Sequence, residues 1–147
     1  MVKPLFALLL AQSLLAPKPT VQHVTVAPSV IRGADGRLTL ALEVTPNPRI
    51  HVYAPGAKDF TVVTLILTPQ PDVSAGKPVY PKADVAAAPG ADDAPAYAKV
   101  FRITQPVTVK AGASKDLTIA GVLNYQACDD RVCYPVSSLT VTWSLHQ

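Results

Sequence analysis

Apolar and polar residues alternate along most of the chain after residue 20. Apolar side chains occupy every second position from Leu38 to Val44 and again from Leu139 to Leu145. This period of two places one set of side chains against a core and the other toward solvent, as in a half-buried β-strand. An amphipathic helix would need apolar residues at spacings of three and four, which these segments lack. The pattern therefore predicts strands rather than helices.

Five further segments have the composition of strands, with turn residues between them. They are Gln22–Ala27, Arg49–Tyr53, Thr61–Leu67, Lys99–Val109 and Asp116–Tyr125. Residues that favour turns gather at 33–36, 45–48 and 111–114. About seven to nine short strands with this punctuation predict an all-β protein, an immunoglobulin-like β-sandwich. The single Trp143 is expected in its core.

The segment Pro69–Ala98 interrupts this alternation. It contains six of the 15 prolines and almost no period of two. A stretch of this length without regular structure is unusual inside a compact domain, and it is either a functional lid or a disordered loop. Tyr80 and Tyr97 give the segment side chains with which it can dock. Both interpretations remain open at this point.

The first 16 residues are typical of a secretory signal peptide. A positive charge at Lys3 precedes an apolar stretch from Leu5 to Leu10, which polar Gln12 and Ser13 separate from the apolar residues 14–16 before Pro17. This stretch is shorter than the roughly 20 residues that span a bilayer. We predict a signal peptide over residues 1–16, one domain over residues 20–147, a periplasmic or secreted location, and no stable membrane insertion after removal of the signal. The alternative is a buried first element of the domain.

Composition and charge exclude several classes of protein. The 147 residues suffice for one domain, and 49% of them are hydrophobic against 16% charged, so the chain can bury a core. The 13 lysines and arginines exceed the 10 acidic residues by three, but they are scattered along the chain. Nucleic-acid binding needs clustered basic residues, so we expect no nucleic-acid partner. Two cysteines are too few for a disulfide-dense scaffold.

The candidate chemistry lies at these two cysteines. Cys128 ends a predicted strand, a charged four-residue turn follows, and Cys133 opens the next extended piece. In a hairpin the two Cβ atoms can face each other at bonding distance. A structural bridge here would close a very small loop and stabilise the protein by only about 2 kcal/mol. A short ring near solvent is instead the kind of disulfide that exchanges with a partner's thiolate. The residues alone favour a redox-active pair, with a structural disulfide as the alternative.

Metal binding is a third interpretation of the thiols. Zinc or copper would need further soft or imidazole ligands. The chain offers His23, His51 and His146, and none of them is close in sequence to either cysteine. A closed site would require His51 to fold over the pair. We therefore expect neither a metal nor another cofactor.

The sequence around the cysteines resembles the redox motif of the N-terminal periplasmic domain of DsbD, the thiol:disulfide interchange protein. The matching residues are Tyr125-Gln126-Ala127-Cys128-Asp129-Asp130 and Cys133-Tyr134-Pro135. Residues 49–54 resemble that family's aromatic-containing strand beside the active site, and residues 97–101 resemble the end of its cap loop and the following strand. The resemblance extends over roughly residues 25–145.

The resemblance implies an immunoglobulin-like domain that carries reducing equivalents by thiol–disulfide exchange, as a component of a protein-disulfide reductase system. A thioredoxin-like protein or domain would be the donor, and disulfide-containing periplasmic proteins would be the acceptors. By position, Cys133 would form the mixed disulfide and Cys128 would resolve it. The residues that would line the site are His51, Tyr53, Tyr97, Tyr125 and Gln126.

Two departures from the family pattern qualify this expectation. Well-known members carry an aromatic cap residue just before the position of Tyr97, where this chain has Pro95 and Ala96. Tyr97 or Tyr80 would then cap the site instead. The sequence also ends at Gln147 without a thioredoxin-like part, so we expect a separate protein as reductant. The competing interpretations are an immunoglobulin-like interaction module with a purely structural disulfide, and a copper or zinc carrier.

Overall fold

The computed structural model describes residues 21–86, 88 and 94–146, and every regular element among them is a β-strand. The predicted signal peptide, residues 1–16, lies outside the described residues. Within the described ranges, no helix is long and apolar enough to cross a membrane. The strands are β1 (Val24–Arg32), β2 (Leu38–Pro46), β3 (His51–Tyr53), β4 (Thr64–Leu67), β5 (Val73–Ala75), β6 (Ala96–Tyr97), β7 (Phe101–Val109), β8 (Asp116–Tyr125), β9 (Ala127–Cys128) and β10 (Ser137–His146).

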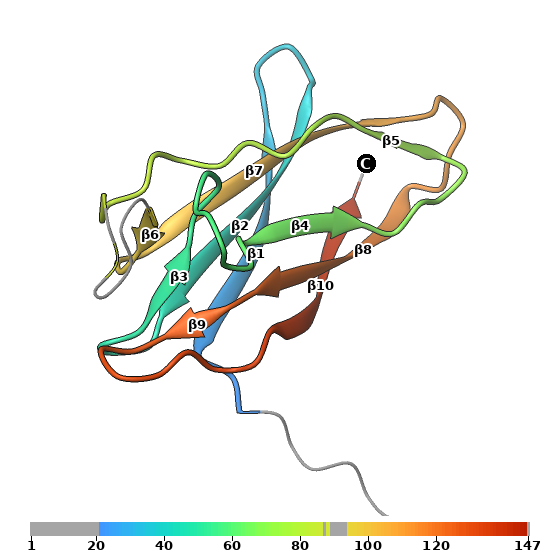
Figure 1. Cartoon of the computed structure of the whole chain (residues 1–147). Helices are drawn as coiled ribbons and strands as arrows, with labels where there is room; N and C mark the ends of the chain where they lie inside the picture. Colours follow the sequence, from blue (N-terminus) through green and yellow to red (C-terminus); the bar gives the residue numbers. More distant parts are fainter. Residues whose placement is uncertain (1–20, 87, 89–93, 147) are drawn as a thin grey trace, which may run out of the picture.

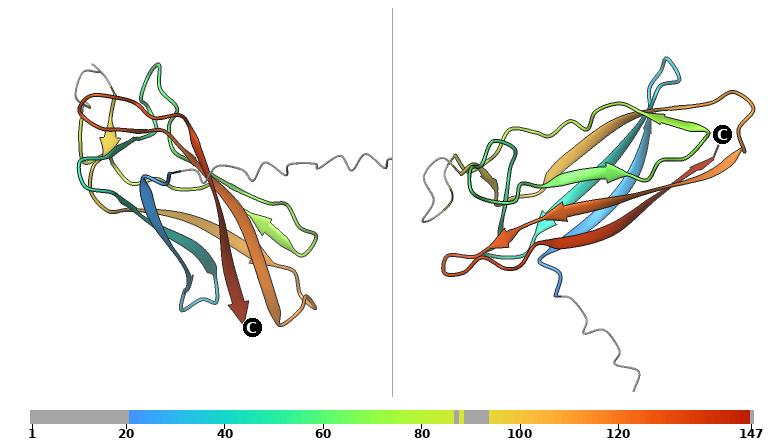
Figure 2. Two further views of the ribbon diagram at one scale, coloured as in Figure 1. Left: turned by 90° about the horizontal axis from the view of Figure 1, so that it is seen from below. Right: turned by 45° about the vertical axis from the view of Figure 1, so that its right-hand side comes forward.

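The strands form three antiparallel sheets (Figure 1). One has the order β1-β2-β7-β5, the second β10-β8-β4, and the smallest β6-β3-β9. The two larger sheets form the layers of a sandwich, and the smallest lies at the end away from the C-terminus (Figures 1 and 2). The predicted all-β, immunoglobulin-like sandwich is confirmed. The structure describes ten strands, and the sequence predicts seven to nine. β5 and β6 lie in the segment Pro69–Ala98, where the sequence has almost no period of two, and β9 has only two residues.

The core lies between the two larger sheets and is filled by alternate residues of their strands. In β10, buried and exposed residues alternate from Ser137 to His146 without exception. Trp143 is 1% exposed, and its indole N–H donates a hydrogen bond of 2.9 Å to the carbonyl of Ala41 in β2. A buried tryptophan usually finds such a partner for its one polar atom. Trp143 therefore occupies the predicted core position and ties the facing sheets together.

Two prolines lie inside strands without ending them. β1 continues through Pro28 to Arg32, whereas the sequence predicts an end at Ala27. β1 is the edge strand of its sheet, where a missing backbone N–H is tolerated. β7 likewise continues through Pro106, whose carbonyl accepts a hydrogen bond from the Gly76 N–H. β1 is therefore longer than the sequence predicts, whereas β7 ends at Val109 as expected.

The proline-rich segment Pro69–Ala98 is hydrogen-bonded to the sandwich over much of its described part. β5 pairs with β7, and further along the chain Val79 exchanges two backbone hydrogen bonds with Thr104 of β7. Val85 pairs in the same way with Ala96 of β6. Among its described residues only β5 and β6 are regular strands, and isolated backbone pairs hold further residues in place. Backbone hydrogen bonds to β7 hold β5 and Val79 in place, and such bonds do not require apolar residues at every second position.

Replacing Trp143 by phenylalanine is expected to lower the free energy of unfolding by about 1–3 kcal/mol, because the Ala41 carbonyl would lose its buried partner. Urea denaturation followed by circular dichroism measures the change. Ser144→Ala, at the exposed neighbouring position of β10, is the control and is expected to change the same quantity by less than about 0.5 kcal/mol. Equal effects of the two substitutions would contradict the assigned role of the indole hydrogen bond.

Candidate functional site

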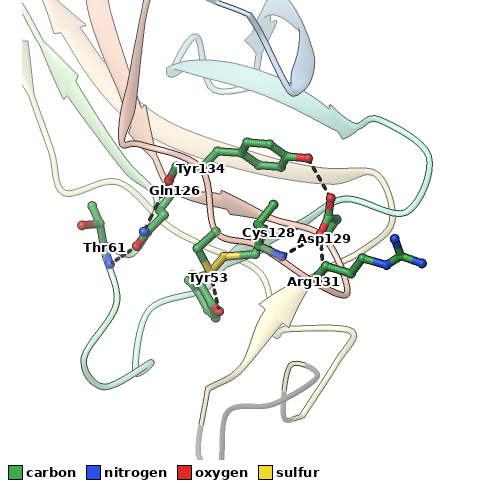
Figure 3. The surroundings of a disulfide bond; sticks show 9 residues. Tyr53, Thr61, Gln126, Cys128, Asp129, Arg131 and Tyr134 are labelled. Carbon is green, nitrogen blue, oxygen red and sulfur yellow. Dashed lines mark hydrogen bonds between the residues drawn. A yellow bond between two sulfur atoms is a disulfide. The ribbon is translucent and has the colours of Figure 1, made fainter.

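The two cysteines form a disulfide that closes a hairpin at the end of the sandwich (Figure 3). Cys128 belongs to β9, Cys133 lies five residues further on, and their Cα atoms are 4.0 Å apart. Backbone hydrogen bonds flank the bridge: the Asp129 N–H donates to the Val132 carbonyl at 3.0 Å, and the Tyr134 N–H donates to the Ala127 carbonyl at 2.8 Å. The hairpin predicted from the cysteine spacing is therefore present.

The two cysteines differ in their access to solvent. Cys128 is 1% exposed and packs in a small cluster with residues of β3 and β6, apart from the main core. Cys133 is exposed, and so are the apolar residues near it, Val132 and Val136. A partner's thiolate can thus approach Cys133 from solvent, whereas Cys128 is covered.

The small sheet divides its residues between two environments. In the pairing of β3 with β9, His51 lies opposite Cys128 and Val52 lies opposite Ala127. Successive side chains of a strand point to opposite faces, and directly opposed residues share a face. Val52 and Ala127 pack in the main core, whereas Tyr53 and Cys128 pack in the second cluster. His51, Tyr53 and Cys128 therefore occupy one face, which is the face of the disulfide.

Two of the predicted site tyrosines lie in the main core instead. Tyr97 is opposite Val52 in the sheet, its ring stacks on Phe101 with centroids 3.9 Å apart, and its hydroxyl donates to the Pro81 carbonyl. Burial is the main cause that raises the pKa of Tyr97 to about 12, so the hydroxyl stays protonated. Tyr125 is fully buried, and its hydroxyl accepts a hydrogen bond from the His23 N–H. The structure does not bring these rings to the face of the cysteines.

Tyr80, the other residue expected to cap the cysteines, is also engaged elsewhere. Its hydroxyl accepts a hydrogen bond of 2.9 Å from the Leu65 N–H in β4. Its ring is partly buried and packs against the main core rather than against the cluster that contains Cys128. Tyr80 therefore fastens the proline-rich segment to the sandwich.

Tyr53 is the aromatic residue that contacts the disulfide. Its hydroxyl donates to the Sγ of Cys133 at 3.6 Å, because a disulfide sulfur has no proton to give (Figure 3). Burial raises the pKa of Tyr53, which keeps this donor protonated. The Tyr53 ring also stacks on Phe60, with centroids 4.0 Å apart and planes at 19°. Tyr53 is thus held between the disulfide and a second aromatic ring.

Sequence reasoning missed Phe60. This residue lies in the loop between β3 and β4, which turns at Gly56 and Asp59, both with positive φ. Phe60 packs against the cluster that contains Tyr53 and Cys128. The sequence does show a large apolar residue in the loop directly after the strand predicted to line the site. This observation does not indicate that the Phe60 ring contacts Tyr53.

The carboxylate of Asp129 organises the turn between the cysteines. It accepts hydrogen bonds from the Arg131 N–H at 2.7 Å, the Val132 N–H at 2.8 Å and the Tyr134 hydroxyl at 2.7 Å (Figure 3). The Tyr134 bond is the largest of the causes that lower the pKa of Asp129 to about 2. The same bond raises the pKa of Tyr134. Asp129 is therefore an ionised cap of the hairpin.

Gln126 connects the hairpin to the loop that carries Phe60. Its side-chain oxygen accepts a hydrogen bond from the Thr61 N–H at 3.1 Å, and its amide N–H donates to the Tyr134 carbonyl at 3.5 Å (Figure 3). The amide thus bridges both segments that surround the disulfide. Neither of these hydrogen bonds involves a sulfur atom. Gln126 therefore holds the two segments around the disulfide in place without bonding to the disulfide itself.

His51 is buried beside the disulfide with an unsatisfied polar atom. It is 5% exposed, and its Nε2 has no hydrogen-bond partner. Burial is the main cause that lowers the pKa of His51, and the charges of Asp130 and Asp129 act in the opposite direction. The ring meets that of Tyr53 edge-on, with centroids 5.5 Å apart.

The surroundings of the hairpin carry charge of both signs. A groove of about 360 Å³ lies between residues 48–50 and the turn, and Arg49 and Arg131 line it together with Asp129 and Asp130. No cluster of three or more histidine, cysteine or acidic side chains able to hold a metal ion occurs in residues 21–86, 88 and 94–146.

Fold and site together define a class: an immunoglobulin-like sandwich with a disulfide hairpin at one end, of the kind that supports thiol–disulfide exchange. The family model for the N-terminal region of the thiol:disulfide interchange protein DsbD matches residues 13–144. The chain therefore belongs to the DsbD N-terminal domain family, as its sequence motif suggests. Family membership supports a role in thiol–disulfide exchange.

Two solved structures share the fold. The reduced N-terminal domain of DsbD from Neisseria meningitidis is 16% identical, with a TM-score of 0.55 over 83% of this chain and 86% of that chain. The N-terminal periplasmic domain of ScsB from Proteus mirabilis is 21% identical, with a TM-score of 0.51 over 86% of this chain and 48% of that chain. No curated protein matches the sequence.

Removing the Asp129 carboxylate is expected to destabilise the protein in a pH-dependent way. Its pKa is depressed from 3.8 to about 2, so its contribution is present above pH 3.8 and is lost as the pH falls toward 2. The stability difference between wild type and Asp129→Ala should therefore be largest near neutral pH and shrink in acid. Urea denaturation at several pH values measures it, with Asp130→Ala in the same turn as control. A difference that stays constant down to pH 2 would contradict the role of the ionised cap.

Proposed function

We propose that this domain is a periplasmic thiol–disulfide exchange carrier. It accepts reducing equivalents from a thioredoxin-like donor and passes them to disulfides of periplasmic proteins through Cys128 and Cys133. Membership of the DsbD N-terminal family supports the exchange chemistry. The Proteus mirabilis domain of the same fold is described as periplasmic, which supports the location.

The unequal exposure of the two cysteines is the observation that carries this proposal. Exchange begins when a thiolate attacks an accessible sulfur in line with the disulfide bond. Cys133 is exposed and Cys128 is buried, so attack on the bridge falls on Cys133. Cys128 remains within bonding reach, because the hairpin holds the two Cα atoms 4.0 Å apart. One sulfur is therefore suited to meet partners and the other to resolve the mixed disulfide.

Delivery of reducing equivalents takes two displacements. The Cys133 thiolate attacks a sulfur of the acceptor disulfide, a mixed disulfide forms, and the acceptor's other sulfur leaves as a thiolate. Cys128 then attacks the Sγ of Cys133, which closes the bridge and releases the acceptor's second thiolate. The two cysteines lose two electrons and the acceptor disulfide gains them. Reduction by the donor dithiol follows the same steps in reverse.

Tyr53 and Phe60 limit which molecules reach the bridge. The Tyr53 hydroxyl contacts the Sγ of Cys133, and the stacked Phe60 holds the ring in place. This arrangement shields one side of the disulfide and leaves the approach from the exposed side of the hairpin. We therefore expect partners to approach Cys133 from the side of the turn between the cysteines.

A Cys128→Ala variant is expected to trap partners through Cys133. The reduced variant is mixed with a thioredoxin-fold protein that keeps one active-site cysteine, activated as a mixed disulfide with thionitrobenzoate. Cys133 displaces thionitrobenzoate, and the adduct of the two proteins should accumulate because neither of them then has a second thiol to resolve it. Non-reducing electrophoresis and mass spectrometry detect the adduct. The matched Cys133→Ala variant should form at least tenfold less, since Cys128 is 1% exposed. Stronger trapping by Cys133→Ala would reverse the assignment of the two thiols.

The reduction potential separates the carrier from an interaction module with a structural disulfide. Structural disulfides of secreted proteins lie below about −300 mV, whereas a carrier must be reducible by its donor. We expect a value above about −300 mV. Equilibration with dithiol buffers, followed by alkylation and mass spectrometry, gives the fraction of reduced protein. A value well below this limit would support the structural role and refute the carrier.

A further inference from the structure

We propose that His51 accepts the proton of the buried Cys128 thiol and thereby activates Cys128 for resolution of the mixed disulfide. This inference rests on the exchange function proposed above. It assigns to His51 a chemical role in the second displacement, in addition to its place beside the disulfide. The first displacement, by the exposed Cys133, does not involve it.

The register of the small sheet brings the two residues together. His51 of β3 is the direct partner of Cys128 of β9. Side chains of directly opposed residues lie on the same face, with Cβ atoms roughly 4.5–5.5 Å apart. Both residues are covered, at 5% and 1% exposure. The imidazole and the sulfur therefore share a space that bulk water does not reach freely.

The Nε2 atom of His51 can accept a proton or a hydrogen bond from a neighbouring thiol. This atom is buried without a hydrogen-bond partner while the cysteines are bridged. Buried polar atoms in proteins are nearly always paired, so an exception calls for a physical reason. In the disulfide Cys128 carries no proton, whereas after reduction its S–H is a donor directly across the sheet from this acceptor. Reduction thus supplies the partner that the oxidised protein lacks.

The charges around His51 suit a group that gains and loses a proton. Burial favours the neutral imidazole, which is the form that can accept. On the hairpin packed against β3, the carboxylates of Asp130 and Asp129 favour the protonated form. On β3 itself, Tyr53 stays neutral because burial raises its pKa. From the loop after β3, the residue that packs against this cluster is the uncharged Phe60.

The proposed step balances as follows. His51 takes the proton of the Cys128 thiol and becomes an imidazolium, which leaves Cys128 as a thiolate. The thiolate attacks the Sγ of Cys133, a Cys128–Cys133 bond forms, and the bond between Cys133 and the acceptor sulfur breaks. The acceptor sulfur leaves with the electron pair as a thiolate. The imidazolium then returns its proton to solvent.

The test follows the two displacements separately with the chromogenic disulfide 5,5′-dithiobis(2-nitrobenzoate). Reduced protein mixed with one equivalent should release one thionitrobenzoate on attack by Cys133 and a second on resolution by Cys128. Cys128→Ala should show the first release alone, which assigns the phases. His51→Gln and His51→Phe should slow the second release at least tenfold and change the first less than twofold.

The pH profile distinguishes proton acceptance from a merely structural role. In the wild type, the rate of the second release should rise as the imidazole loses its proton and then reach a plateau near neutral pH. In His51→Gln the plateau should be absent, and the rate should rise only as the thiol itself ionises. If both His51 variants fail to fold, the wild-type profile decides: no rise in the range of imidazole titration would overturn the proposal.

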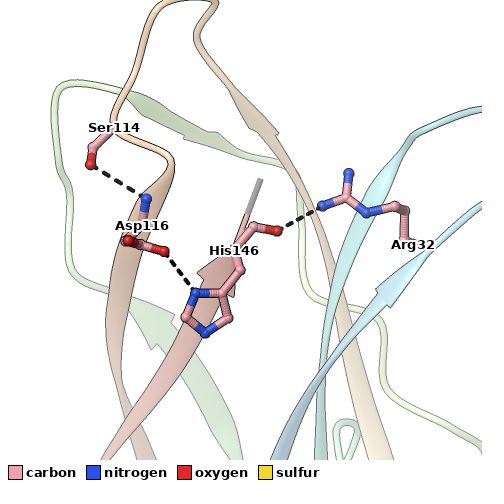
Figure 4. Close-up of polar contacts among 4 residues, drawn as sticks. All are labelled: Arg32, Ser114, Asp116 and His146. Carbon is pink, nitrogen blue, oxygen red and sulfur yellow. Dashed lines mark hydrogen bonds and ion pairs between the residues drawn. The ribbon is translucent and has the colours of Figure 1, made fainter.

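His146 ends β10 at the C-terminal end of the sandwich, away from β9 (Figure 1), and its contacts are drawn in Figure 4. It provides a matched control. It is exposed, and its Nδ1 lies 2.7 Å from the Asp116 carboxylate. His146→Gln should leave both releases unchanged. Failure of the wild type to show two releases would refute the proposed exchange function. Two releases in the wild type with unchanged rates in the folded His51 variants would refute only the role of His51.

Discussion

Two backbone pairs between β3 and β9 hold the cysteine hairpin against the rest of the sandwich, and the other features of the site depend on them. The pairs are His51 with Cys128 and Val52 with Ala127. Because strands alternate, this register also decides which side chains enter the main core and which face the sulfur atoms. A shift by one residue would exchange Val52 for His51 in the core. The packing of Val52 and Ala127 in the main core therefore determines that His51, Tyr53 and Cys128 lie together on the opposite face.

Much of the fold could be predicted from the sequence, because long half-buried strands carry a strong period of two. β8 has the bounds expected for it, and the core position of Trp143 follows from the alternation in β10. β5 and β6 were not predicted, and β9 was expected only as the end of a strand that runs into Cys128. β5, β6 and β9 are held by backbone hydrogen bonds to neighbouring strands, and two or three residues cannot show a period. Tertiary pairing, rather than local pattern, creates them.

The candidate site was predictable at the cysteines and less so around them. The spacing of Cys128 and Cys133 predicts a hairpin, and the hairpin is present. Tyr97 was expected beside the cysteines, but neighbours along a strand point to opposite faces, so a shift of one position places its ring in the main core. The contact of Phe60 with Tyr53 depends on the path of a loop, which composition does not specify. Closeness in the sequence therefore predicts which residues lie near the cysteines more readily than it predicts which face of the sheet their side chains occupy.

The disulfide lies inside a single hairpin, only five residues from end to end. Opening it separates no distant parts of the chain, and two backbone hydrogen bonds, from Tyr134 to Ala127 and from Asp129 to Val132, also join the two arms of the hairpin. The disulfide therefore joins no strands that are distant in the sequence, and we expect the sandwich to keep its strand order when the disulfide is reduced. In the proposed carrier, one sandwich would then serve both the reduced and the oxidised state of the cysteine pair. Substitutions in the distant sandwich are therefore expected to change the free energy of unfolding more than the reduction potential of the disulfide.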